Sequence, residues 1–107
     1  MAAAELHILL ALAGEDLHGY GIMQEIARQT EGQYRVGPGT LYDNLKKLLR
    51  HGLVEETANR NTKSDPRRRY YRLKAAGRAV LKLEIERLTA VVQEARTHLR
   101  GLRARRA

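Results

Sequence analysis

The chain has 107 residues, enough for one compact domain and one additional element but too few for two independent cores. Its 20 Lys and Arg residues outnumber 12 Asp and Glu residues, and the net charge of +8 favours an anionic partner, nucleic acid before a membrane surface. The absence of cysteine excludes disulfides and thiolate metal sites. The longest apolar run, residues 8–13, is too short to span a bilayer, so we expect a cytoplasmic protein without membrane association.

Two helices are predicted in the first 30 residues. The first covers residues 2–13 and has apolar side chains on more than one face, Leu6 and Leu9 among them. Such a helix must be covered on more than one side, and in so small a chain we expect a second subunit to supply part of that cover. The second helix is predicted over residues 18–30, with His18 at its start.

Residues 37–52 predict a third helix with two unlike faces. Its Gly-Pro-Gly-Thr start suits helix initiation, with the Thr40 hydroxyl suited to capping, and Gly52 is placed to end the helix. Leucines recur at helical spacing on one face, and polar and basic residues occupy the other. This pattern fits a surface helix with solvated lysines, or the second helix of a helix-turn-helix that enters a DNA major groove. On the second interpretation, the expected DNA-binding residues are Gly39, Thr40, Tyr42, Lys46 and Lys47.

A β-hairpin is predicted next. Residues 53–57 open like a strand, residues 59–66 are rich in turn-forming types, and residues 68–73 combine alternation with tyrosines. Because neighbouring strand residues face opposite ways, we expect at least one of Tyr70 and Tyr71 to pack inside the hairpin. Two strands with a basic tip directly after a helix-turn-helix form a wing. Its cations are expected to contact DNA phosphates: Lys63, Arg67, Arg68 and Arg69.

A long last helix is predicted over residues 74–100, interrupted only by Gly77 near its start, where the cost is small. Apolar residues at alternating spacings of four and three form three heptads of a coiled-coil seam. At roughly 1.5 Å per residue the helix is about 40 Å long, and no second helix of that length exists to receive it within one chain. Off the seam, Val80, Leu83 and Val91 are expected to dock it onto its own wing or first helix. The expected dimer interface consists of Leu6, Leu9, Leu81, Ile85, Leu88, Val92, Ala95, Leu99 and Leu102.

Taken together, these segments resemble the PadR family of transcriptional regulators over nearly the whole chain. The motifs that carry the resemblance are LHGYGI at 17–22, GTLY at 39–42, GLV at 52–54, and RYYRL at 69–73 followed by AAG at 75–77. The resemblance implies a mainly α fold with a small β-hairpin. A winged helix-turn-helix would occupy residues 1–73, and a dimerisation helix with a basic tail residues 74–107. It also implies that Tyr42 is the tyrosine of the recognition helix.

The leading functional hypothesis is a sequence-specific, dimeric repressor that binds double-stranded DNA at a pseudo-palindromic operator. The alternative is a ligand- or partner-sensing dimer whose basic tail binds nucleic acid or acidic protein without sequence choice. A small-molecule effector stays open, although the lack of Trp and Phe disfavours an aromatic sandwich for flat ligands. We expect no enzyme, metal site or cofactor, because the four histidines are scattered and no nucleophile lies beside a base.

Overall fold

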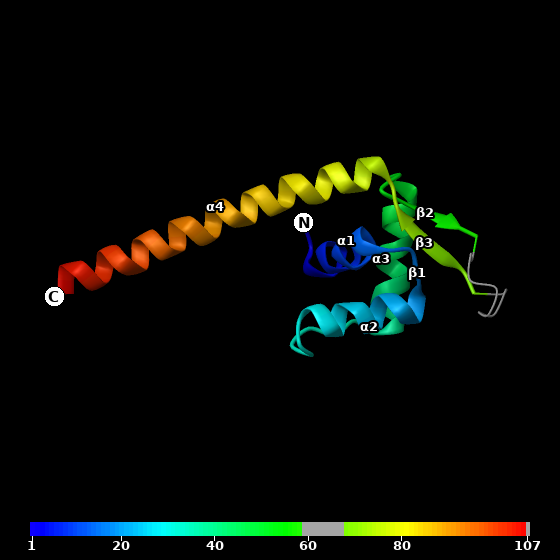
Figure 1. Ribbon diagram of the computed structural model, residues 1–107, viewed down its shortest axis with the longest axis horizontal. Coiled ribbons are helices and arrows are strands. Elements are labelled where there is room, and N and C mark those ends of the chain that lie inside the picture. The colour runs from blue at the N-terminus through cyan, green and yellow to red at the C-terminus, as the bar shows by residue number, and fades with distance from the viewer. Residues whose placement is uncertain (59–67, 107) are drawn as a thin grey trace.

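The computed structural model describes the backbone of residues 1–58 and 68–106 and the side chains of residues 1–58 and 68–101. The described residues form four helices and three short strands (Figure 1). This architecture confirms the expected fold class, a mainly α winged helix-turn-helix with a long last helix. The expected wing tip, with Lys63 and Arg67, lies outside the described residues. The elements in chain order are α1 (Ala3–Gly14), β1 (Leu17–His18), α2 (Gly19–Gln29), α3 (Pro38–Arg50), β2 (Val54–Thr57), β3 (Tyr70–Leu73) and α4 (Ala75–Arg106).

The sheet has three antiparallel strands in the order β1-β3-β2. The two strands expected from the sequence are present, and β1 adds a third that was not predicted because two residues are too few to show alternation. Its pairing places His18 opposite Tyr70, which attaches the start of α2 to the base of the wing. In β3 the side chain of Tyr71 is buried while Tyr70 is half-buried, which confirms the expected packing role for one tyrosine.

α1 lies in the core and is covered by its own chain. It contacts α2, α3, α4 and β3 (Figure 1). Ile8 and Leu9 are 0% exposed, and Leu6 is half-buried against the same core. Each such buried aliphatic side chain contributes roughly 1.5–3 kcal/mol. Four other elements of the same chain thus cover much of this helix, and the expected contribution of a second subunit to the rest stays a prediction.

α3 has one buried face and clear ends. Leu41, Leu45 and Leu48 are at most 2% exposed, as their spacing predicts. The helix begins at Pro38 after Gly37, with no side-chain cap, so the expected capping role of Thr40 was wrong. At the other end Gly52 has a φ of 73°, and the N–H groups of residues 52 and 53 bond back to the last turn, a Schellman motif that confirms the predicted stop.

α4 packs on the domain only through its first turns and then extends away from it (Figure 1). Leu81 belongs to the core of the domain and is 4% exposed. Beyond it, Leu83 is 66% and Val91 52% exposed, so the expected docking of these two residues onto the wing or α1 was wrong. Among the described residues the distal half of the helix is solvated, which contradicts the alternative that all of it packs inside one chain.

Candidate nucleic-acid interface

The DNA-binding residues that the sequence predicts on α3 lie together on its outer, exposed face. Because the leucines occupy the inner face, the polar side chains between them point outward. Five predicted contacts lie on this helix and all are exposed; Tyr42, for example, is 46% exposed. The structure therefore brings these five together: Gly39, Thr40, Tyr42, Lys46 and Lys47.

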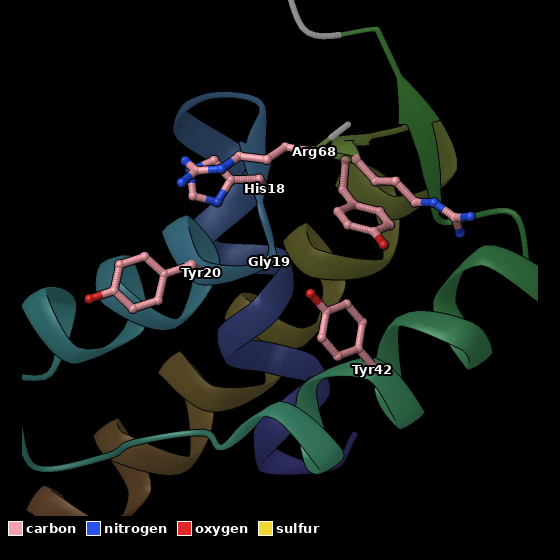
Figure 2. A pocket seen from close by; sticks show the side chains of 7 residues that line it. His18, Gly19, Tyr20, Tyr42 and Arg68 are labelled. Atoms are coloured by element: carbon pink, nitrogen blue, oxygen red, sulfur yellow. The ribbon is translucent and has the colours of Figure 1, made fainter. Parts of the chain in front are cut away.

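A hollow of about 540 Å³ connects α3 with the start of α2 and the base of the wing (Figure 2). Tyr42 contributes the α3 wall, and its hydroxyl points into the space. Arg68 and Arg69 directly precede β3 and line the hollow, so two of the predicted wing arginines lie beside α3. The full lining consists of His18, Gly19, Tyr20, Tyr42, Arg68, Arg69 and Tyr71.

Gly19 allows Tyr42 to lie close to the start of α2. A Cβ atom at Gly19 would collide with the Tyr42 hydroxyl and lie 3.0 Å from the Cζ atom of the same ring. No other residue type fits under this ring without displacing it. In the sequence Gly19 is only part of the motif at 17–22, because its contact with α3 joins residues 23 positions apart and has no local signal.

His18 caps α2 and faces the wing. Its Nδ1 atom accepts a hydrogen bond from the backbone N–H of Gly21 at 3.1 Å, which confirms the predicted helix-start role. Its ring meets Tyr70 edge-on with the ring centres 5.3 Å apart, and its Nε2 atom lies 3.1 Å from a terminal nitrogen of Arg68. Burial, followed by the positive charge of Arg68, lowers the pKa of His18. His18 and Tyr20 are site residues that the sequence did not assign, and their position there depends on the unpredicted β1–β3 pairing.

The arginines of this region have different partners. Arg72 forms three hydrogen bonds to the Asp16 carboxylate, at 2.9, 3.2 and 3.4 Å, and thereby ties the segment before β1 to the sheet. Arg69 pairs with Glu56 across the sheet at 3.6 Å. No carboxylate among the residues that the structure describes lies within ion-pair distance of Arg68. Arg72 is thus paired within the fold, whereas Arg68 has no carboxylate partner among the described residues.

The residues of the expected dimer interface differ in how far they are exposed. Leu9 and Leu81 are buried in their own subunit and offer no surface to a second copy, which corrects their assignment to the interface. Leu6 is half-buried in the same core, and the side chain of Leu102 lies outside the described part of the chain. The remaining seam residues lie along the solvated part of α4, with Leu88 half-buried and the others exposed: Ile85, Leu88, Val92, Ala95 and Leu99.

A shallow, largely apolar groove of about 310 Å³ runs along this part of α4. Ile85, Leu88 and Val92 form its apolar wall, and Arg96 stands at its end. These are seam positions of the predicted heptads, so the groove coincides with the strip that a partner helix would contact.

The described residues hold no cluster of three or more side chains that could bind a metal ion. None of the described helices combines the length and the apolar character that crossing a bilayer requires.

Comparison with known proteins agrees with this geometry. The model of the transcriptional regulator PadR-like family matches residues 8–83. The transcriptional regulator Rv3488 of Mycobacterium tuberculosis is 37% identical over 103 residues, which cover 94% of this chain and 92% of the relative. A PadR family transcription regulator of Clostridium difficile has a TM-score of 0.77 at 21% identity, over 92% of this chain and 99% of that one. Bacillus subtilis PadR, solved in complex with operator DNA, has a TM-score of 0.67 at 21% identity, over 79% of this chain and 48% of that one.

Proposed function

Since this chain belongs to the PadR-like family of transcriptional regulators and is a DNA-binding regulator, we propose that it acts as a dimeric repressor at a pseudo-palindromic operator. The observation that carries the proposal is the two-faced α3. Its leucines are buried in the domain, while Lys46 and Lys47 are exposed on the outer side beside Tyr42. A helix held in this way can enter a major groove without giving up any core contact.

The cations around α3 divide into two roles. Lys46 and Lys47 lie on the helix itself and would reach base edges and nearby phosphates. Arg68 and Arg69 lie beside the hollow and would hold flanking phosphates, with Lys63 and Arg67 of the wing extending this contact. The first turn of α3, with Gly39 and Thr40, presents backbone N–H groups that favour a phosphate.

Dimerisation through α4 supplies a second DNA-binding domain. The solvated stretch around Ile85, Leu88 and Val92 is too apolar to be left in water over several turns. Paired along this strip, two copies would present their α3 helices to successive major grooves about 34–36 Å apart. Residues 1–73 would then read DNA and residues 74–107 would hold the dimer together. A small-molecule effector would act by changing this spacing.

Selection of bound duplexes from a random library, followed by mobility shift, tests the proposal. The wild-type protein should enrich a two-fold repeat and retain it in excess random DNA. Replacing Lys46 and Lys47 by Ala should abolish this binding and leave the dimer intact. The matched control replaces two exposed cations of α4, Arg78→Ala with Lys82→Ala, and should retain sequence preference.

Two results would contradict the proposal. One is equal competition by random DNA with a steep loss of binding in salt, which is the behaviour of a module that binds anions without sequence choice. The other is unchanged binding by the Lys46/Lys47 variant, which would remove α3 from the interface.

A further inference from the structure

His18 has a fixed tautomer because of its capping role. Its Nδ1 atom accepts the Gly21 N–H hydrogen bond, so this nitrogen carries no proton. A neutral imidazole has one N–H group, which must therefore be on Nε2. The lowered pKa that follows from burial and from Arg68 is consistent with a neutral ring. The outward-facing atom of His18 is thus a hydrogen-bond donor.

The atom that faces this donor is also a donor. The Nε2 atom of His18 lies 3.1 Å from Nη1 of Arg68, and a guanidinium has N–H groups but no acceptor. The two groups cannot hydrogen-bond to each other. They point into the same space, and Figure 2 shows the Arg68 side chain extending across to the His18 ring. Two converging donors, one of them cationic, favour an acceptor with negative charge.

The groups around this pair contribute no such acceptor among the described residues. Tyr70 packs edge-on against the His18 ring, and Tyr20, Tyr42 and Tyr71 line the same hollow with phenol side chains. Glu56, a carboxylate of β2, pairs with Arg69. No acceptor among the described residues therefore satisfies both donors, and an anion that binds here would meet both of them.

We infer that His18 and Arg68 together bind one backbone phosphate of the DNA duplex, in the hollow between the start of α2 and the base of the wing. This inference rests on the proposed function and adds a specific contact to it. The hollow shares Tyr42 with α3 and Arg69 with the wing, so its anion lies next to the reading helix. The phosphate accepts the Nε2–H of His18 and the fork of Arg68, and the N-terminal dipole of α2 favours its charge. This contact fixes the register of α3 in the groove.

Two substitutions isolate the two donors. His18→Asn retains a side-chain oxygen that can cap α2 but lacks the distal N–H group. Arg68→Ala removes the cation. On a duplex selected by the wild-type protein, each change should weaken binding roughly tenfold, and Arg68→Ala should also reduce the salt slope by about 0.9. Because both groups hold one phosphate, the double variant should lose much less than the product of the two losses.

A scan of the duplex with single methylphosphonate linkages locates the contact. One linkage per half-site should weaken wild-type binding and have no further effect on the His18→Asn/Arg68→Ala double variant. The inference would be overturned if the two single variants lost their response to methylphosphonate at different linkages. It would also be overturned if the loss of binding in the double variant equalled the product of the two single losses. Failure of the proposed function looks different, because the wild-type protein would then select no duplex over random DNA.

A measurement on the free wild-type protein tests the inference even if the protein selects no duplex or a variant does not fold. The long-range proton–nitrogen spectrum of the free wild-type protein should show His18 protonated on Nε2 alone. Titration with inorganic phosphate should shift this signal and that of the Gly21 amide. Protonation on Nδ1, or an unchanged His18 signal at saturating phosphate, would also overturn the inference.

Discussion

Gly77 lies so close to Leu53 that a Cβ atom at position 77 would collide with the Leu53 carbonyl oxygen and lie 3.0 Å from its carbonyl carbon. The same oxygen accepts a hydrogen bond from the backbone N–H of Lys74 at 3.0 Å, so it cannot move aside freely. The Leu73 side chain closes the other side, 2.7 Å from the same Cβ position. The first turn of α4 is thus seated directly on the chain that leads into β2.

Gly77→Ala is expected to lower the free energy of unfolding by roughly 1–3 kcal/mol, because overpacking outweighs the gain in helix propensity of up to about 1 kcal/mol. Urea unfolding at fixed protein concentration measures the change. Gly101→Ala is the matched control, since a Cβ at that helical position meets nothing within 4 Å. The control should be neutral or stabilising, and an equally neutral Gly77→Ala would show that α4 is not seated on Leu53.

Glu31 ends α2 in a left-handed conformation with a φ of 53°. The N–H groups of residues 31 and 32 bond back to the last turn of α2, at 3.2 and 2.7 Å, so this conformation belongs to the helix stop. Glu31→Gly should raise the free energy of unfolding by about 0.5–1 kcal/mol, because glycine adopts this region without strain. Glu31→Ala removes the same charge and keeps the strain, so thermal unfolding should show no comparable gain; equal effects would exclude the backbone explanation.

The pH dependence of stability should contain a contribution from His18. Its pKa in the folded state lies below the model value of 6.5, so the unfolded chain takes up the proton more readily. The stability that neutral His18 provides is complete above that value and is lost as the pH falls through 6.5 toward the folded-state pKa. Unfolding free energies measured between about pH 5 and 7 should therefore fall more steeply for the wild type than for His18→Asn. Parallel curves would contradict this assignment.

Leu88→Lys should convert the proposed dimer into a monomer, because it places a charge in the centre of the expected seam. Sedimentation velocity measures the change. Leu83→Lys introduces the same charge five residues earlier, at a side chain that is 66% exposed and off the seam, and this control should stay dimeric. Dissociation by Leu83→Lys with none by Leu88→Lys would place the contact on the other face of α4.

The elements that could be predicted from the sequence are those with a local signal. Leu41, Leu45 and Leu48 define the buried face of α3 through their spacing, and Gly52 marks its end. The heptads of α4 likewise predict a helix that is longer than one small domain needs. The burial of Leu9 could not be predicted, because the number of elements that cover α1 depends on how the whole chain folds.

The same reason limits prediction of the site. The exposed residues of α3 follow from the period of one helix, so Tyr42 and its neighbours were identified correctly as surface residues. Arg68 lies beside His18, which precedes it by 50 residues, because β1 pairs with β3. A two-residue strand carries too little pattern to predict that pairing. The contact between Gly19 and Tyr42 is non-local in the same way.

The most direct measurement of the central claim, that two copies joined along α4 place two α3 helices on DNA, is a hydroxyl-radical footprint on the selected duplex. It should be combined with the stoichiometry of the complex from sedimentation. We predict two chains per duplex and two protected stretches whose centres lie about 34–36 Å apart, symmetric about the centre of the site. A single protected stretch bound by one chain, or protection spread evenly along the duplex, would contradict the claim.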